Sequence, residues 1–390
     1  MAKILFAWEL GEGMGHLVPM RPVLEALVHN GHELQVAAVD LRSAQSALGD
    51  IATTLVQAPA ITDRSYPLHR PAEGVAELLY MNGFYDADCL QGRHHAWCQL
   101  AALLTPDLII VDHSPGALLM ARALSIPTIH TGTGFSLPPE RLPISFPGFK
   151  DEDNLSKEAA LLTSFNRLIE ASGGTPLVML ADLYNRVAKK FLLTFEEIDH
   201  LGPRTGVSYL GANMPSNGET PVWSGDGPKV FAYLKPFPAI EAFFEAVKAL
   251  NLSLLMVPDR VPPDILRRHE GGNLRFSHQR HNMRALMEQS DFLIFNGNHG
   301  TAAAGLLGGV PMFAFPLHQE HEGCARRLVQ SGIGDAMFQS KPDKLKGMLE
   351  ALIHNNAQRA LCEEKARQYQ NFDYRNSIAS MVADTEEVLG

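Results

Sequence analysis

The chain has 390 residues, of which 46 % are apolar and 19 % are charged, and its formal net charge is −10 at pH 7. At roughly 100–200 residues per domain, this length favours two domains, and the composition is that of an ordinary folded protein. The negative charge argues against sequence-independent binding of nucleic acid, and no apolar run approaches the ~18–20 residues that a membrane-spanning helix needs.

Short apolar runs recur along the first half of the chain, with helical patterns between them. Strands are predicted at 4–8, 34–39, 108–111 and 191–194. An amphipathic helix is predicted from the i, i+3, i+4 spacing of Met20, Val23, Leu24, Leu27 and Val28. Runs that are apolar without strict alternation are typical of parallel sheets covered on both faces. The predicted fold class is therefore α/β.

The second half repeats this organisation. Strands are predicted at 230–234, 252–257, 292–295 and 312–315, and helices around 240–247 and 345–353. The stretches 108–129 and 292–315 both read strand, tight turn, helix, Ile/Val-Pro, strand. This repeated unit predicts two doubly wound domains.

The domain boundary is predicted in the Gly-, Pro- and Asn-rich stretch 211–228. The tail, 376–389, has a helical pattern that we expect to pack back on the first domain. The expected division is an N-terminal domain at 1–212, a linker at 213–228, a C-terminal domain at 229–370 and the returning helix at 371–390.

A glycine-rich turn, "GEGMGHLVP", follows the first predicted strand. A dinucleotide fingerprint, G-x-G-x-x-G, fails here because its third glycine position holds His16 when counted from Gly11, and Val18 when counted from Gly13. The P-loop pattern is absent as well. What remains is a flexible turn at the carboxyl edge of a parallel strand, with Pro19 in the first turn of the following helix. His16 is either a capping or packed histidine, or a side chain delivered to a ligand.

Asp112 ends a predicted strand of the same sheet, so its carboxylate and the His16 ring could converge at one edge. A carboxylate on one imidazole nitrogen fixes the tautomer and leaves the other nitrogen to act as a general base. Ser114 does not lie in a nucleophile elbow, so the proton to be removed would belong to a substrate. The alternative role for Asp112 is a helix N-cap.

The turn "FNGNHGTAAAGLLGGVP" in the second half suits a phosphate. Gly297 and Gly300 permit close backbone approach, and Asn298, His299 and Thr301 offer donors. The Ala-rich helix that follows presents its N-terminal amides and the positive end of its dipole.

Two His-rich patches, "GRHHAWC" and "PLHQEHEGC", lack a standard metal-ligand spacing, and no metal site is expected at either. The second follows a strand, which favours a ligand-facing role. The cysteines are Cys89, Cys98, Cys324 and Cys362. Because no two of them form a C-x-x-C pair, they suit reduced thiols in the cytoplasm.

Four segments together resemble the inverting nucleotide-sugar glycosyltransferases of the UDP-glycosyltransferase-like family. "GMGHLVPMRPVLEALVHNGHEL" looks like that family's G-x-G-H-x-x-P…L-x-x-x-G-H pattern, and "PDLIIVDHSPGALLMARALSIP" like its acceptor-domain Asp segment. "FLLTFEEIDHLGP" resembles its lead into the linker. The closest similarity is the donor signature at 277–334. The resemblance spans nearly the whole chain.

The resemblance implies the GT-B fold, with two Rossmann-like domains and a cleft between them. It implies that His16 is the catalytic base that deprotonates an acceptor hydroxyl and that Asp112 orients it. The implied reaction is an in-line attack on the anomeric carbon, with helix amides rather than a metal stabilising the leaving diphosphate.

The donor site departs from the family pattern. Asn296 replaces a diphosphate-binding His, with His299 or Lys235 as candidates to compensate, Ala304 replaces a ribose-binding Glu, and residues 320–321 replace an Asp-Gln pair that holds hexose hydroxyls. The expected donor-binding residues are Lys235, Ser277, Gln279, Asn296, His299, Gly300, Thr301, Glu320 and His321. UDP- and dTDP-sugars are the expected co-substrates, GDP-sugars stay open, and no cofactor is expected.

The expected acceptor is a small molecule of the natural-product kind. Its candidate contacts, which are equally suited to the core, are Met81, Phe84, Tyr85, Phe135 and Leu137. A monomer or homodimer is expected. The alternatives to a transferase are a sugar-nucleotide epimerase or hydrolase on the same scaffold, in which donor is consumed without acceptor, and a non-catalytic nucleotide-sugar binder.

Overall fold

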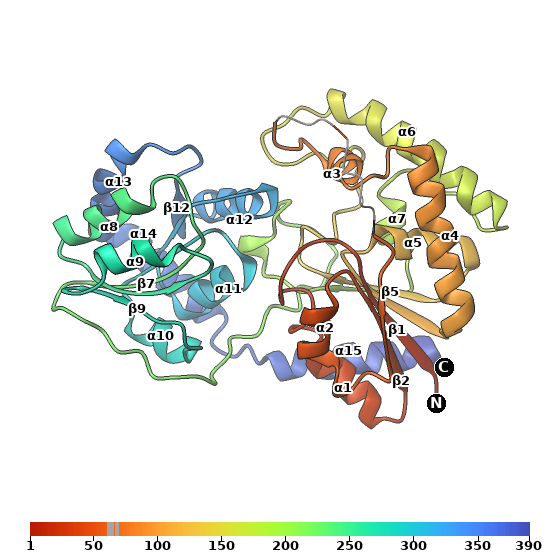
Figure 1. The fold of residues 1–390 in the computed structure, drawn as a ribbon, viewed down its shortest axis with the longest axis horizontal. Coiled ribbons are helices and arrows are strands. Elements are labelled where there is room, and N and C mark those ends of the chain that lie inside the picture. Colours follow the sequence, from red (N-terminus) through yellow and green to blue (C-terminus); the bar gives the residue numbers. More distant parts are fainter. Residues whose placement is uncertain (61–65, 67–69) are drawn as a thin grey trace. The chain divides into compact units, whose positions relative to one another are not determined.

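The computed structural model describes residues 1–60, 66 and 70–390, which form two compact units (Figure 1). Unit 1 comprises Met1–Thr194, Arg204–Gly211 and Asp373–Gly390, and unit 2 comprises Phe195–Pro203 and Ala212–Phe372. Each unit is built around one six-stranded sheet whose paired strands are all parallel.

In unit 1 the strands have the order β3-β2-β1-β4-β5-β6. They are β1 Lys3–Trp8, β2 Glu33–Ala38, β3 Thr54–Gln57, β4 Leu108–Asp112, β5 Thr128–Gly132 and β6 Lys189–Leu192. The helices are α1 Arg21–His29, α2 Leu41–Leu48, α3 Val75–Met81, α4 Ala87–Leu104, α5 Pro115–Leu124, α6 Glu152–Ala171, α7 Asp182–Asn185 and α15 Tyr374–Leu389.

In unit 2 the strands have the order β12-β11-β10-β7-β8-β9. They are β7 Lys229–Leu234, β8 Ser253–Pro258, β9 Leu274–Phe276, β10 Phe292–Phe295, β11 Met312–Ala314 and β12 Gly334–Ala336. The helical elements are η1 Glu196–Ile198, α8 Ile240–Ala249, α9 Pro263–His269, α10 Met283–Gln289, α11 His299–Gly308, α12 Gln319–Gln330, α13 Pro342–His354 and α14 Asn356–Gln368.

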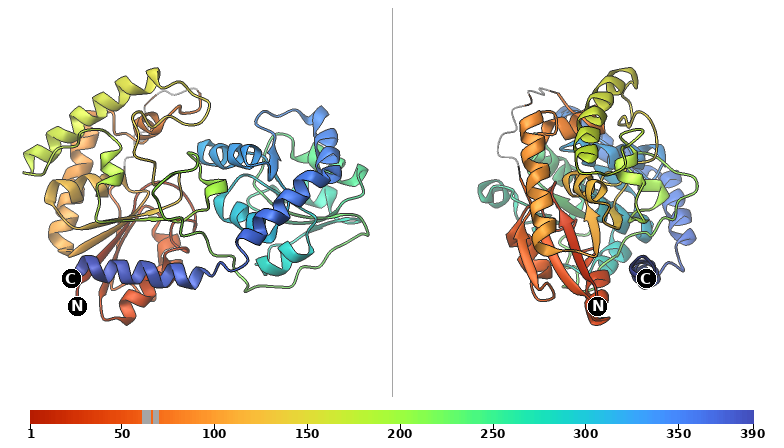
Figure 2. Two further views of the ribbon diagram at one scale, coloured as in Figure 1. Left: turned by 180° about the vertical axis from the view of Figure 1, so that it is seen from behind. Right: turned by 90° about the vertical axis from the view of Figure 1, so that its right-hand side faces the viewer.

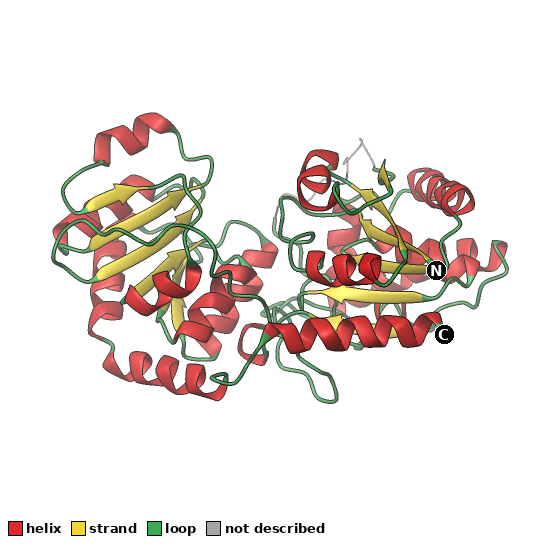
Figure 3. Ribbon diagram, turned by 90° about the horizontal axis from the view of Figure 1, so that it is seen from below, coloured by secondary structure: helices red, strands yellow, loops and turns green. Residues whose placement is uncertain are grey.

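The predicted α/β class is confirmed, because helices flank both faces of each sheet (Figure 3). Apolar and polar residues do not alternate along strand β7 because both of its faces are buried. Val230 and Ala232 pack into one core cluster, and Phe231 packs into another on the opposite face of the sheet. Counted from its first strand, each unit has the doubly wound order 3-2-1-4-5-6.

All eight predicted strands are present, but the sequence patterns missed β3, β9 and β12. Each of the three is an edge strand of only three or four residues, so it is too short to give a periodic signal. A further correction concerns Pro19, which lies in a turn before α1. Helix α1 begins at Arg21, and Pro22 occupies its first turn.

The C-terminal helix α15 belongs to unit 1, where it packs against α1 and β6 (Figure 2). The Tyr374 hydroxyl donates to the carbonyl of Pro19 at 3.2 Å, and the Ser377 hydroxyl donates to the carbonyl of Leu210 at 2.7 Å. The end of the chain therefore contacts the segment that leads from the glycine turn into α1.

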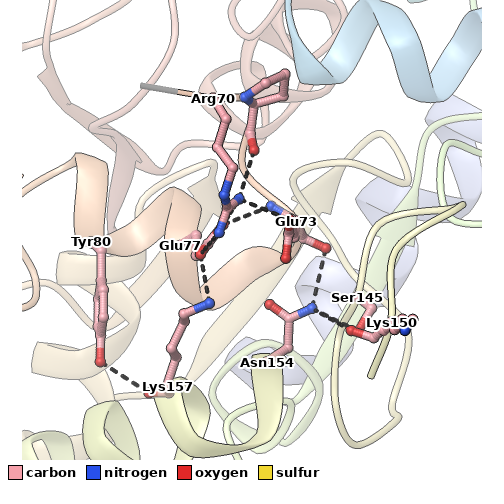
Figure 4. Close-up of polar contacts among 9 residues, drawn as sticks. Arg70, Glu73, Glu77, Tyr80, Ser145, Lys150, Asn154 and Lys157 are labelled. Atoms are coloured by element: carbon pink, nitrogen blue, oxygen red, sulfur yellow. Dashed lines mark hydrogen bonds and ion pairs between the residues drawn. The ribbon is translucent and has the colours of Figure 1, made fainter. Parts of the chain in front are cut away.

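A polar network joins α3 to α6 in unit 1 (Figure 4). The buried Glu77 carboxylate accepts two hydrogen bonds from Arg70, at 2.8 and 2.9 Å, and pairs with the Lys157 ammonium at 2.6 Å. Burial alone would raise the pKa of Glu77, but these partners outweigh it and lower the pKa to about 2. The network fixes the position of α3 on α6.

The neighbouring Glu158 is also a buried carboxyl group, but its pKa is shifted upward and not downward. Its Oε1 accepts a hydrogen bond from the Ile144 amide at 2.6 Å, while Oε2 has no hydrogen-bond partner among the described residues. Burial raises the pKa of Glu158 from 4.5 to about 7, although the Ile144 amide and Arg141 act in the opposite direction. Ionisation of Glu158 therefore opposes folding.

Replacing Glu158 with glutamine is expected to remove a pH dependence of stability. Because the folded-state pKa is raised, the wild-type free energy of unfolding should fall between pH 4.5 and pH 8, by about 3 kcal/mol. Urea unfolding at several pH values should show that Glu158→Gln is the more stable protein at pH 8. Glu170→Gln, at an exposed position of the same helix, is the control, and an unchanged pH dependence in Glu158→Gln would contradict the prediction.

Candidate active site

One candidate site lies at the switch point of the unit 1 sheet. Strands β1 and β4 are neighbours there, with Trp8 paired to Asp112, and the chain leaves them toward opposite sides of the sheet. Ligands of open α/β sheets bind outside the carboxyl ends of the strands at this point. His16 follows β1, and Asp112 is the last residue of β4.

The structure brings His16 and Asp112 together. Nδ1 of His16 lies 3.1 Å from Oδ1 of Asp112, and both side chains are largely buried, with exposures of 14 % and 5 %. The imidazole also stacks on the Trp8 indole, with 5.6 Å between ring centroids. Because Nδ1 faces a carboxylate, Nε2 is the nitrogen that can take a proton from another molecule.

Gly11 lies close to that nitrogen. Its φ of +96° lies in the region that favours glycine, and a Cβ built on it would stand 2.6 Å from Nε2 of His16. Any other residue would therefore crowd the base. The glycine turn thus delivers a histidine to the sheet edge, and it does so without a side chain at position 11 that would clash with the ring.

Beneath this pair lies a buried charge cluster that the sequence patterns missed. The carboxylate of Glu9 pairs with the Arg93 guanidinium at 3.3 Å and accepts hydrogen bonds from the Gly116 amide at 2.7 Å and the Ser114 hydroxyl at 3.2 Å. Burial raises the pKa of Glu9, an effect that Arg93 opposes. Its only signal in the sequence is an acidic residue directly after a buried strand.

The expected acceptor contacts fall into different environments. Phe84 and Leu137 are buried in unit 1, and the Phe84 ring packs on Phe165 and under the Arg93 guanidinium. Tyr85 is 39 % exposed, whereas Met81 is partly buried.

Phe135, the fifth expected acceptor contact, packs against a residue that lies beside the His16 ring. Its ring lies edge-on to His113 at 5.8 Å, and His113 in turn lies 5.4 Å from the His16 ring.

A separate candidate site lies at the corresponding switch point of unit 2, between β7 and β10. Asn296, directly after β10, accepts a hydrogen bond from the Lys235 amide at 2.6 Å and donates one to the carbonyl of Phe315 at 2.9 Å. The Asn296 side chain therefore ties together the ends of β7, β10 and β11. The Lys235 ammonium lies 4.0 Å from the Asp259 carboxylate.

Helix α11 begins beside this point. Gly297 has a φ of +96°, and a Cβ on it would meet the His321 carbonyl at 2.6 Å, so the turn requires glycine. A Cβ built on Gly300 meets no described atom within 4 Å, which leaves the first turn of the helix open. Thr301 is buried and its hydroxyl accepts a hydrogen bond from Asn298. His299 is also buried, which lowers its pKa to about 4.

The residues after β11 present two imidazoles in close contact, with their ring planes inclined by 32°. The rings of His318 and His321 lie 3.7 Å apart, and Glu320 follows His318 in the first turn of α12. Burial, His318 and the Lys235 ammonium together lower the pKa of His321 to about 2, so this ring is neutral.

Ser277 and Gln279 follow β9 at the same edge of the sheet. The Ser277 hydroxyl is 2.8 Å from Nε2 of His281 and accepts a hydrogen bond from the Gln279 amide at 3.3 Å. The Gln279 side chain is exposed. All nine expected donor-site residues thus follow strands of one sheet at its carboxyl edge.

The described part of the chain lacks two structural features. It contains no group of three or more His, Cys, Asp or Glu side chains placed to hold a metal ion. No helix within it is both long and apolar enough to cross a membrane.

The chain matches no known family by its sequence profile and no curated protein by its sequence. Solved structures match it over its full length. The calicheamicin glycosyltransferase CalG4 aligns with a TM-score of 0.72 and 17 % identity, covering 100 % of this chain and 98 % of that one. The glycotransferase of kitacinnamycin aligns with a TM-score of 0.71 and 19 % identity, covering 100 % and 99 %.

A third match is the glycosyltransferase VinC in complex with dTDP, with a TM-score of 0.64, 15 % identity and coverage of 99 % and 100 %. These likenesses establish the fold. The chain has the GT-B architecture of two Rossmann-like units, as the resemblance in its sequence implied.

Proposed function

We propose that this chain is an inverting glycosyltransferase that moves a sugar from a nucleoside-diphosphate sugar to a hydroxyl group of a small natural-product acceptor. The observation that carries the proposal is the His16–Asp112 pair at the switch point of unit 1, in a fold shared over its full length with glycosyltransferases.

In the proposed reaction His16 is the general base. Nε2 takes the proton of the acceptor hydroxyl while that oxygen attacks the anomeric carbon from the face opposite the leaving diphosphate, so the configuration inverts. Asp112 holds Nδ1 and stabilises the imidazolium that forms. The matched glycosyltransferases of kitacinnamycin and calicheamicin support an acceptor of this class.

Unit 2 is proposed to bind the donor, with UDP or dTDP as the nucleotide. The open first turn of α11 offers backbone N–H groups and the positive end of the helix dipole to a diphosphate, which supports a leaving group stabilised without a metal ion. The dTDP complex of VinC supports a thymidine nucleotide. Ser277 and Gln279 are proposed to contact the base and ribose, and residues 318–321 the sugar.

A thermal-shift titration against UDP, dTDP, GDP, ADP and NAD tests the donor site. A nucleotide that binds only the folded protein stabilises it, by about 2.7 kcal/mol at a hundred times its Kd. We expect dTDP or UDP to raise Tm and NAD to leave it unchanged. A shift with NAD alone, or with no nucleotide, would contradict the proposal.

Gly300→Val sharpens this test, because the space around Gly300 accommodates the side chain while filling the first turn of α11. It should keep the Tm of the free protein and lose the nucleotide-induced shift. Gly347→Val, at another open and exposed position, should keep both.

With the donor identified, consumption of the sugar nucleotide without an acceptor would favour a hydrolase or epimerase instead.

A further inference from the structure

The indole of Trp8 is held firmly beside the His16–Asp112 pair. Trp8 is the last residue of β1, its side chain is fully buried, and it lies opposite Asp112 in the register of β1 and β4. Its Nε1 donates to the carbonyl of Leu10 at 2.6 Å, and the amide of Leu10 donates to the carbonyl of His113 at 2.9 Å. The one polar atom of the buried indole is therefore paired, and the ring is fixed where the two strands end.

The indole meets the ring of His16 through its face. The two ring centroids are 5.6 Å apart and the planes are inclined by 26°. Asp112 contacts the same imidazole elsewhere, at Nδ1. A hydrogen bond to one nitrogen lets the imidazole plane tilt, because a carboxylate oxygen accepts over a broad range of directions. Contact with the flat indole restricts that tilt.

The same contact favours the charged form of the imidazole. The face of an aromatic ring is negative, and tryptophan attracts a cation most strongly, within about 6 Å of the ring centroid. The separation of 5.6 Å lies within this range. Because Trp8 is fully buried and the His16 side chain is only 14 % exposed, water screens the attraction little. The attraction therefore grows when His16 takes up a proton.

We propose that Trp8 is a positioning residue for the base: its indole face fixes the plane of the His16 imidazole and stabilises the imidazolium that forms during turnover. This inference rests on the proposed transferase function. In that reaction the acceptor proton moves to His16 as the oxygen bonds to the anomeric carbon, and the electron pair of the old glycosyl C–O bond leaves with the diphosphate. Asp112 and Trp8 then stabilise the new positive charge from two directions.

A test must separate the indole from the titratable side chains near the imidazole. Asp112 contacts Nδ1, and Glu12 lies in the same glycine turn. His113 lies 5.4 Å from the His16 ring, but burial, together with His16 and His130, lowers the pKa of His113 well below its ordinary range, so this ring is neutral. Fluorine on the indole changes none of these groups, and it withdraws electron density from the ring face.

Fluorinated tryptophan tests the charge effect in the free protein, without substrate. The chain contains three tryptophans, Trp8, Trp97 and Trp223. We expect the midpoint of the His16 titration, followed by NMR, to fall to lower pH with monofluorinated and further with difluorinated tryptophan. His16→Gln identifies the signal. Trp8→Phe labelled in the same way is the control and should not respond, because its fluorine is confined to Trp97 and Trp223. A midpoint that does not depend on fluorine, or an equal response in the control, would overturn the proposal.

Trp8→Leu removes the aromatic face altogether. The titration midpoint should fall by about 0.4–1.5 pH units and kcat about 3- to 30-fold, as expected from the usual strength of a cation–π contact, with the donor KM unchanged. Phe165→Leu controls for lost packing, because this equally buried aromatic residue packs on Phe84. It should lose stability and keep the midpoint. A wild-type midpoint in Trp8→Leu would contradict the proposal, whereas a fluorine-dependent midpoint in a protein that transfers no sugar would overturn only the transferase function.

Discussion

Replacing His16 with alanine is expected to lower kcat about 10²–10⁴-fold, the usual contribution of a positioned general base. In the proposed reaction the acceptor hydroxyl would then have no group to receive its proton, because Nε2 of His16 is the ring nitrogen that does not face Asp112. The measurement is steady-state turnover with the donor identified by thermal shift. Asp112→Asn should give a smaller reduction, since it leaves the base in place but changes the partner of Nδ1.

Two measurements separate a catalytic loss from a loss of structure. The nucleotide-induced thermal shift should be the same in His16→Ala and the wild type, because the proposed donor residues all lie in unit 2. His29→Ala, at an exposed position in the last turn of α1, should retain full turnover. Near-normal kcat in His16→Ala would exclude His16 as the base.

The convergence of His16 and Asp112 could be predicted from the sequence because topology alone brings them together. Asp112 ends one parallel strand and His16 lies in the turn after its neighbour, and parallel strands place their carboxyl ends at one edge. The same reasoning brought the turns after β7, β10 and β11 together in unit 2. Local sequence patterns are therefore enough to predict where a residue lies when the strand before it sets its position.

Contacts that depend on side-chain packing could not be predicted in this way. Glu9 and Arg93 are 84 positions apart, and nothing in the spacing of α4 indicates which of its residues meets the end of β1. The environment of Phe84 also cannot be predicted from the sequence, since an aromatic residue after a helix is equally suited to a pocket and to a core. In the structure Phe84 is buried. The left-handed backbone of His113 likewise depends on partners in another turn.

The buried pair of Glu9 and Arg93 yields the largest expected effect on stability. Arg93→Met keeps much of the side-chain volume but leaves the Glu9 carboxylate in the core without its counter-charge, which is expected to cost about 3–5 kcal/mol of unfolding free energy near pH 7. Urea unfolding measures this cost. Arg268→Met is the control, because its 2.6 Å pair with Glu241 is exposed and should contribute less than about 1 kcal/mol.

The pH dependence identifies the cause of this loss. Burial already raises the pKa of Glu9, and loss of Arg93 removes the opposing effect of its charge, so in Arg93→Met the pKa should rise further. A raised folded-state pKa gives stability that is present at acid pH and lost as the pH increases. The deficit of the variant should therefore be smallest near pH 4 and grow toward pH 8. Glu9→Gln/Arg93→Met should recover most of it, because no charge is left to bury. Two results would contradict this cause: a loss of unfolding free energy in Arg93→Met that is equal at all pH values, or a double variant no more stable than Arg93→Met. Either result would show that lost packing around Phe84, and not the unpaired carboxylate, destabilises the variant.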